Sequence, residues 1–265
     1  MDILHAIYLA LLQGLTEFLP ISSSGHLILL PHLFEWTDQG LAFDVAVHLG
    51  SLVAVVTYFR AELYLLGRDW LSHLNGGTLT ENGRLAWGVI VATIPVGVAA
   101  LIFGDIVETE LRKVVPIALA TIFFGLVIWW FDARRKENRD EHSIGWRDIL
   151  IIGFAQALAL IPGTSRSGIT IAAGLAMGLT RSAAARFSFL LSIPVILLAS
   201  LSQVLKILET GSNQSWSTLM VGTIVSTISA YFCIHFFLKL VQSIGLLPFV
   251  IYRLFLGVVL LIYFV

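Results

Sequence analysis

Six stretches of this chain are almost free of charge and long enough to cross a bilayer, and this pattern restricts the possible folds most. They lie at residues 43–59, 85–104, 114–131, 187–205, 217–238 and 247–265. A helix needs about 20 apolar residues to span the hydrocarbon layer, with a range of about 17 to 25. Inside that layer each backbone polar group must be hydrogen-bonded within the protein, which favours helices. We therefore predict an all-α integral membrane protein with about six transmembrane helices.

The composition supports this prediction and excludes other classes of protein. Hydrophobic residues make up 57% of the chain and charged residues 12%, whereas a soluble domain has about 25% charged residues. The net charge of -1 leaves no basic face that could neutralise a nucleic-acid backbone. No polar stretch is long enough for a separate soluble unit, so we predict one polytopic domain over residues 1–265.

Four shorter apolar segments surround two polar, turn-forming stretches. These segments, at 3–19, 26–34, 148–161 and 169–179, are too short to span a membrane. Proline, glycine and serine residues interrupt them near positions 20 and 162. Irregular backbone at membrane depth is tolerated where it is buried in protein or lines a water-filled cavity. We therefore predict two re-entrant helical hairpins whose turns line a cavity.

The hairpins also divide the chain into two similar halves. The intervals from Gln13 to Gly25 and from Gln156 to Gly168 are both twelve residues long, with a leucine two places after the glutamine. Each half has one hairpin and three spans, and because three is odd the second half must be inverted. The predicted halves cover about 1–132 and 148–265, joined by the polar loop 133–147. Inverted repeats of this kind place a site near the membrane midplane.

The basic residues predict an orientation in the membrane. With six spans, nine basic residues lie on the side of the linking loop and three on the opposite side. Because cytoplasmic loops carry an excess of lysine and arginine, the linking loop is predicted to be cytoplasmic. Both termini and the first hairpin then face the outside.

The first polar stretch contains an acid, serines and a histidine. Glu17 follows Gln13 by four residues, so both side chains share one face of a helix. This oxygen pair suits a hard cation such as Mg²⁺, although Glu17 could instead act as a general base or position an arginine. His26 could transfer a proton near neutral pH. Ser23 could be a nucleophile activated by His26 or a hydrogen-bond donor to phosphate, and Ser22 is a weaker candidate of the same type.

The second polar stretch combines an arginine with hydroxyl groups. The guanidinium of Arg166 has the fork geometry that binds two phosphate oxygens. Backbone N–H groups at the start of the following helix could add donors. Charged groups inside a membrane protein are functional candidates, which also applies to Asp44 and Arg253. The predicted substrate-binding set is Gln13, Ser22, Asp44, Gly163, Thr164, Ser165, Ser167, Thr170 and Arg253.

Together the two stretches resemble the bacterial undecaprenyl pyrophosphate phosphatases, also called bacitracin-resistance proteins. This family carries an (E/Q)xxxE pattern, which Gln13 and Glu17 match, followed by a Pro-x-Ser-Ser-x-x-His element, which residues 20–26 match. It also carries PGxSRSxxT, which residues 162–170 match without departure. Many members have Glu where this chain has Gln13, and this difference removes one candidate metal carboxylate. The resemblance covers the whole chain.

The resemblance implies an enzyme of the bacterial cytoplasmic (inner) membrane. Its substrate would be the C55 polyprenyl pyrophosphate, dephosphorylated to the monophosphate to recycle the lipid carrier of cell-wall polymers and confer bacitracin resistance. The implied cofactor is a divalent cation, Mg²⁺ or alternatively Ca²⁺, held by Glu17 and Gln13, and the sequence leaves a homodimer open. A lipid transporter or flippase is the alternative, because transporters also use inverted repeats with broken helices. The predicted catalytic residues are Glu17, Ser23, His26 and Arg166.

Overall fold

A computed structural model describes residues 2–27, 36, 39–136, 138–211 and 214–264. Over these ranges the secondary structure is helical and contains no β-strand. The predicted all-α membrane architecture is confirmed, because six helices are long and apolar enough to cross a membrane. These helices are α3 (Leu41–Tyr58), α5 (Glu81–Thr109), α6 (Val114–Arg134), α9 (Arg181–Thr210), α10 (Trp216–Ile244) and α11 (Leu247–Phe264).

Polar residues cap the first turns of three of these helices, and two of them, α5 and α9, begin four to six residues before their apolar runs. Thr80, Thr180 and Ser215 each accept a hydrogen bond from the backbone N–H three residues later, at the starts of α5, α9 and α10. Such caps satisfy N–H groups that have no partner within the helix. The apolar run marks the part of each helix that fits a bilayer, whereas the cap marks where the helix begins.

Helix α4 (Arg60–Leu74) was not predicted, because it is amphipathic and has no long apolar run. Leu66 is buried on one face, whereas Tyr64 and Leu71 are exposed. The helix is connected to the start of α5 through Asp69, whose Oδ2 accepts hydrogen bonds from Thr80 and Asn82. These contacts hold α4 against the start of α5.

Each polar stretch forms a turn between two short helices. In the first unit, α1 (Ile3–Thr16) leads through a turn at 17–22 into helical residues 23–27. In the second unit, α7 (Trp146–Ala157) and the 3-10 helix η2 (Leu158–Leu160) lead through a turn into α8 (Arg166–Ala176). Most of the predicted segment 26–34 lies outside the described residues. That these units are re-entrant in a membrane, and that the halves 1–132 and 148–265 are inverted repeats, stay predictions.

The two turns have matching local geometry. Ser22 and Ser165 have φ values of 73° and 71°, and within the described chain they are the non-glycine residues with positive φ. Each serine Oγ accepts a hydrogen bond from the N–H of a glycine three residues later, Gly25 or Gly168. A left-handed conformation is costly for serine, so its use at both positions indicates that the cap geometry is required. The match agrees with the predicted repeat.

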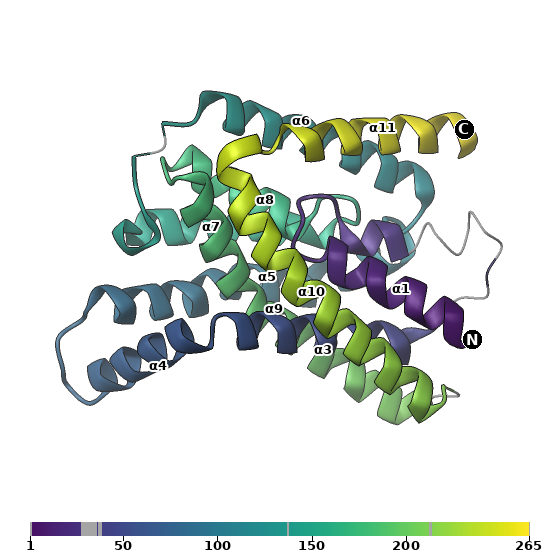
Figure 1. The fold of residues 1–265 in the computed structure, drawn as a ribbon, viewed down its shortest axis with the longest axis horizontal. Helices are drawn as coiled ribbons and strands as arrows, with labels where there is room; N and C mark the ends of the chain where they lie inside the picture. The colour runs from purple at the N-terminus through teal and green to yellow at the C-terminus, as the bar shows by residue number, and fades with distance from the viewer. Residues whose placement is uncertain (1, 28–35, 37–38, 137, 212–213, 265) are drawn as a thin grey trace.

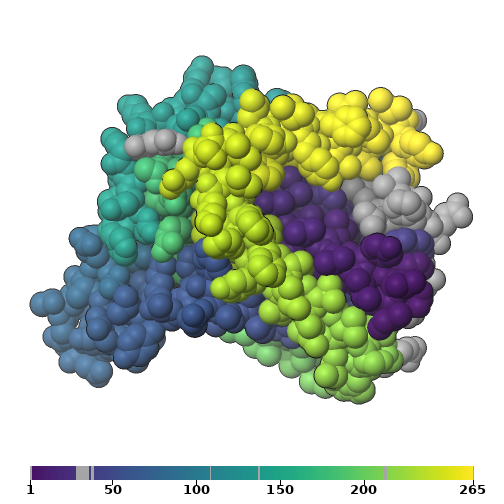
Figure 2. All heavy atoms as spheres, viewed as in Figure 1, coloured from purple at the N-terminus to yellow at the C-terminus, as the bar shows by residue number. Residues whose placement is uncertain are grey.

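Helix α10 packs closely against α1 and α3 through small residues. A Cβ atom on Gly14 would lie 1.9 Å from Ser229 Oγ, and one on Gly50 would lie 2.5 Å from Thr223 O. Small residues let membrane helices approach this closely. Figure 1 shows α10 running diagonally beside α1, and Figure 2 shows the surface that they form together. The first turn, which follows α1, is buried in the molecule at Phe18 and Ser22.

The remaining helices place the second turn against the first. Helices α6 and α11 lie side by side along one edge of the molecule (Figure 1). Both termini lie at one end of the longest axis, and the connections α4–α5 and α6–α7 lie at the other end. Phe18, in the first turn, meets Phe189 of α9 edge to face, with ring centroids 5.1 Å apart. The core therefore supports both turns from several helices.

Candidate active site

Glu17 lies directly after α1, at the centre of a polar cluster. Its Oε2 accepts hydrogen bonds from Gln13 Nε2 at 2.9 Å and from Ser23 Oγ at 2.7 Å. Its Oε1 accepts a hydrogen bond from Arg166 Nη2 at 3.0 Å. The Glu17 and Arg166 side chains are 8% and 11% exposed. Glu17 therefore connects the two turns, although its partner lies 149 residues away in the chain.

Arg166 is the first residue of α8, and a second helix fixes its orientation. Its Nη1 donates to the carbonyl oxygen of Ser188 in α9 at 3.0 Å. The Ser188 hydroxyl shares a hydrogen bond of 2.7 Å with Thr170 Oγ1, one turn after Arg166. A buried ion pair is tolerated where its geometry is good and further hydrogen bonds satisfy its groups. Hydrogen bonds to Glu17 and Ser188 thus fix the orientation of the planar guanidinium group of Arg166.

Hydroxyl and glycine residues of the second turn complete this arrangement. Ser167 Oγ donates to Leu19 O of the first turn at 2.8 Å, so the turns are also linked through backbone. Ser165 lies on the same face, with its Oγ 3.2 Å from that of Ser167. Thr164 is buried, and its Oγ1 has no hydrogen-bond partner in the described part of the chain. Gly163 has φ of 93°, and a Cβ there would lie 2.4 Å from Ile117 O, so only glycine fits.

Arg253 of α11 is fully buried and contacts both turns at corresponding positions. Its Nη1 donates to Pro20 O at 3.2 Å and its Nη2 to Gly163 O at 2.8 Å. Its Nε donates to Thr121 O of α6 at 3.2 Å. Pro20 and Gly163 are equivalent when Gln13 is aligned with Gln156. Arg253 therefore links α11 to α6 and to both turns through main-chain carbonyl oxygens. A contact between Arg253 and a substrate stays a prediction.

His26 lies one turn after Ser23, but the two side chains have different partners. His26 Nδ1 lies 2.7 Å from Ser22 O, and His26 Nε2 lies 2.5 Å from the hydroxyl of Tyr252. The Ser23 hydroxyl donates instead to Glu17. In this arrangement the acceptor of the Ser23 proton is a carboxylate rather than an imidazole. Tyr252 was missed because its neighbour in space is 226 residues away in the sequence.

Helix α3 reaches the cluster through His48, which lay outside the predicted site. His48 Nε2 lies 3.9 Å from Glu17 Oε2, and its Nδ1 lies 2.7 Å from Asp44 O. Asp44, in the first turn of α3, accepts a hydrogen bond from Gln39 Nε2 at 2.9 Å. The spacing of four residues between Asp44 and His48 is the sequence signal that could have identified the histidine. A contact of Asp44 with substrate stays a prediction.

The residues near Glu17 could supply some of the ligands of a cation, with the substrate supplying others. Gln13 is fully buried, and its Oε1 has no hydrogen-bond partner among the described residues. Gln13 turns its amide nitrogen to the Glu17 carboxylate, so a flip of the amide would place this oxygen beside Glu17. Amide and carboxylate oxygens are ligands of the type that Mg²⁺ or Ca²⁺ takes. The described residues contain no group of three or more His, Cys, Asp and Glu that could hold a metal. The oxygens therefore fit a site completed by water and phosphate, not a cage made of protein alone.

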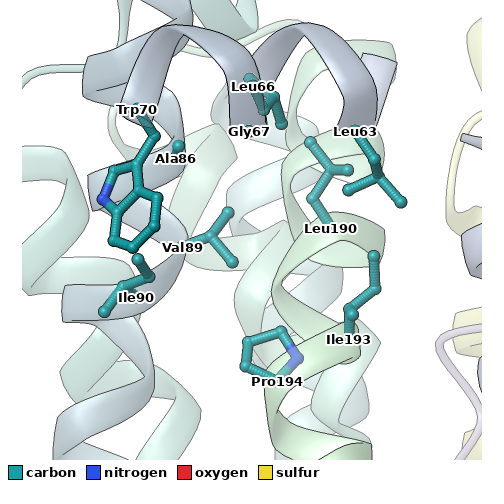
Figure 3. Close-up of a pocket in the computed structure, with 10 residues that line it drawn as sticks. All are labelled: Leu63, Leu66, Gly67, Trp70, Ala86, Val89, Ile90, Leu190, Ile193 and Pro194. Carbon is teal, nitrogen blue, oxygen red and sulfur yellow. The ribbon is translucent and has the colours of Figure 1, made fainter. Parts of the chain in front are cut away.

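An apolar pocket lies apart from this cluster, between α4, α5 and α9 (Figure 3). Its lining includes Leu66 and Trp70 of α4, Val89 of α5, and Leu190 and Pro194 of α9, and none of the lining residues is charged. An anionic group needs cationic or hydrogen-bonding partners when it leaves water. The lining of this pocket therefore offers no partner to the charged group of a substrate.

The structure brings most of the predicted site residues into one place. Direct hydrogen bonds join Gln13, Glu17, Ser23 and Arg166. The hydroxyls of Ser22, Ser165, Ser167 and Thr170 lie in or next to the two turns. Ser188 was missed, since a serine in an apolar helix has no distinguishing sequence signal. The assembled groups, a carboxylate bonded to a hydroxyl and to a guanidinium, can activate a nucleophile beside an anion-binding arginine.

Proteins of one known family are similar to this chain over nearly its whole length. The family model for bacitracin resistance protein BacA matches residues 6–259. Undecaprenyl-diphosphatase 2 of Stutzerimonas stutzeri (strain A1501) is 58% identical over all of this chain and 99% of its own length. The undecaprenyl-diphosphatase of Thioalkalivibrio sulfidiphilus is 57% identical over the full length of both chains. That of Nitrosococcus oceani is 56% identical over 98% of each chain. The chain therefore belongs to the bacitracin resistance protein BacA family.

Proposed function

We propose that this protein is an undecaprenyl-diphosphatase, which hydrolyses undecaprenyl diphosphate to undecaprenyl phosphate and phosphate. The observation that carries the proposal is the buried contact between Glu17, Ser23 and Arg166 across the two turns. Relatives that align over the full chain bear the name of this activity. The reaction recycles the lipid carrier of cell-wall polymers, and sustaining that supply accounts for resistance to bacitracin.

Arg166 and the nearby hydroxyls bind the terminal phosphoryl group. The guanidinium neutralises negative charge as it spreads over the phosphoryl oxygens in the transition state. Ser165, Ser167 and Thr170 lie beside it, although Thr170 Oγ1 also lies 2.8 Å from Arg166 O. Glu17 holds Arg166 in place before substrate arrives, which reduces the rearrangement needed during reaction.

Glu17 accepts the proton of the attacking group. In the covalent route, Ser23 Oγ attacks the terminal phosphorus, its proton passes to Glu17, and the bond to the bridging oxygen breaks to release undecaprenyl phosphate. Water then hydrolyses the phosphoserine to release phosphate. In the direct route, Glu17 deprotonates water, which attacks the same phosphorus. The Ser23–Glu17 hydrogen bond of 2.7 Å supports the covalent route.

A divalent cation completes the proposed site. Glu17 and Gln13 would hold Mg²⁺, with Ca²⁺ as the alternative. The buried Oε1 of Gln13, which has no hydrogen-bond partner in the described ranges, supports this assignment. When bound, the ion supplies positive charge that stabilises the phosphate oxygens. The ion and the Arg166 guanidinium would then share the negative charge of the headgroup. The apolar C55 tail remains among the exposed apolar side chains that face lipid.

We place the protein in the bacterial cytoplasmic (inner) membrane with the active site facing outward. In the structure α9 begins at Arg181, so Arg181 and Arg186 join the basic residues on the side of the linking loop. These residues strengthen the positive-inside argument for a cytoplasmic loop. A homodimer is a further proposal, tested by the molar mass of the purified protein–detergent complex.

The proposal is tested by phosphate release from undecaprenyl diphosphate by the purified protein in detergent. The expected result is steady release that EDTA abolishes and Mg²⁺ restores. Release that EDTA leaves unchanged would remove the cation from the proposal and keep the hydrolysis. If folded protein releases no phosphate but moves undecaprenyl phosphate across reconstituted vesicles, the protein is a transporter instead.

A further inference from the structure

Tyr252 of α11 contacts the ring of His26, which lies just after the first turn. Its hydroxyl lies 2.5 Å from His26 Nε2, and the two rings are nearly parallel, with an angle of 9° and centroids 5.6 Å apart. This geometry brings the phenol oxygen to the edge of the imidazole, where the Nε2 lone pair or proton points. Tyr252 is 39% exposed, whereas His26 is 5% exposed.

The other ring nitrogen determines which atom donates in this contact. His26 Nδ1 lies 2.7 Å from the carbonyl oxygen of Ser22, and a carbonyl only accepts. Nδ1 must therefore carry a hydrogen. In the neutral ring Nε2 then has a lone pair, so the Tyr252 hydroxyl donates to it. The surrounding hydrogen bonds thus select one tautomer.

Arg253, the next residue of α11, fixes Tyr252 relative to the two turns. The guanidinium binds Pro20 O and Gly163 O, and its Nε binds Thr121 O. These three bonds allow α11 little movement where it passes the first turn. The Tyr252 hydroxyl is therefore held at a constant place beside the segment that carries Ser23 and His26.

We propose that Tyr252 is a positioning residue, which holds His26 neutral in the Nδ1–H tautomer and orients Nε2 for proton transfer. A catalytic base that is oriented by a third group is a recurring arrangement in nucleophilic catalysis. Because Ser23 already donates to Glu17, His26 serves a later proton transfer, such as activation of the water that completes turnover. The expected effect of Tyr252 on the rate of phosphate release rests on the proposed function, whereas the assignment of the His26 tautomer does not.

The test uses Tyr252→Phe, which keeps the ring and removes the hydroxyl. Tyr263→Phe is the matched control, since Tyr263 lies on the same helix and is 77% exposed. Protein labelled with ¹⁵N-histidine is studied by NMR in detergent, and His26 signals are assigned by their loss in His26→Gln. We expect a protonated Nδ1 and an unprotonated, hydrogen-bonded Nε2 in the wild type. Tyr252→Phe should shift the Nε2 signal, and Tyr263→Phe should not.

Kinetics provide the second readout. Tyr252→Phe should lower kcat for phosphate release about 10- to 100-fold with KM little changed, because orientation of His26 and not substrate binding is lost. An unchanged Nε2 signal in Tyr252→Phe, or a protonated Nε2 in the wild type, would overturn the proposed contact. Unchanged kcat, or a raised KM alone, would overturn the positioning role. If the wild type releases no phosphate, the proposed function fails, while the spectra still decide the tautomer.

Discussion

At the scale of single residues, the site consists of buried polar groups that depend on one another. Glu17 serves as acceptor for Gln13, Ser23 and Arg166 at once. Arg253 has main-chain carbonyls as its described partners instead of a carboxylate. Removing one member of such a network leaves the others without partners, at a cost of about 1 to 3 kcal/mol for each buried group. Each residue therefore has a distinct, measurable consequence.

Ser23→Ala should lower the rate of phosphate release by at least about 100-fold, because Glu17 would lose the hydroxyl that it activates. Ser24→Ala is the matched control, since Ser24 is the next residue and its side chain is exposed. Initial rates of both purified variants in detergent provide the measurement. A Ser23→Ala rate within threefold of the wild type would favour direct attack by water and contradict the nucleophile assignment.

Arg253→Leu should destabilise the protein by about 3 kcal/mol, because three carbonyl oxygens would lose the guanidinium donor and Gly163 O would keep only a long hydrogen bond from Thr121 Oγ1. Thermal unfolding in detergent measures this change. Arg253→Lys should retain part of the stability, since an ammonium group can still donate to some of the three oxygens. An unchanged melting temperature for Arg253→Leu with a raised KM would instead indicate that Arg253 binds the headgroup.

At the scale of elements, the sequence predicted more of the fold than of the contacts. The apolar runs located all six long helices, since bilayer thickness imposes their length. Helix α4 was not predicted, because its amphipathic pattern lacks such a run. Proline, glycine and serine correctly located both turns. The pairing of Ser23 with Glu17 rather than His26 was not predictable, because it depends on Ser22 and Tyr252 engaging the imidazole.

The second turn should tolerate no side chain at position 163. Gly163→Ala would place a Cβ 2.4 Å from Ile117 O at a φ of 93°, so the backbone must move and carry Arg166 with it. Gly178→Ala is the matched control, since its φ of 85° is similar but its nearest neighbour would be 3.2 Å away. We expect a larger loss of stability for Gly163→Ala than for Gly178→Ala, and a large loss of phosphate release for Gly163→Ala only. Equal effects of the two substitutions on both measurements would show that φ strain alone matters.

Acid should loosen the contact of α4 with α5. Hydrogen bonds from Arg68, Asn82 and Thr80 lower the pKa of Asp69 below its ordinary value. A lowered pKa contributes stability above the unfolded value of about 3.9, and this stability is lost as pH falls through the folded value. Hydrogen exchange in α4, corrected for its intrinsic pH dependence, should therefore increase below about pH 4. Asp69→Asn should remove this pH dependence, and its persistence would contradict the assignment.

At the scale of the whole molecule, the two turns each contribute part of the site. The first turn supplies Glu17 and Ser23, whereas the second supplies Arg166 and its hydroxyl neighbours. The resemblance between the turns predicted that they meet, and the Glu17–Arg166 contact supports that part of the hypothesis. Two residues hold the turns in place from distant parts of the chain: Ser188 of α9 and Arg253 of α11. Their role could not be predicted from the sequence, because it depends on how the helices pack. The proposed activity depends on holding both turns together.

The most direct test of this account is the rate of phosphate release from undecaprenyl diphosphate by Arg166→Ala, compared with Arg60→Ala. Arg60 is an exposed arginine whose described hydrogen bond goes to a neighbouring backbone carbonyl, so its loss should leave the rate unchanged. We expect Arg166→Ala to fold and to release phosphate at least about 1,000-fold more slowly, because transition-state charge loses its main partner. A folded Arg166→Ala protein with a rate close to that of Arg60→Ala would contradict the account.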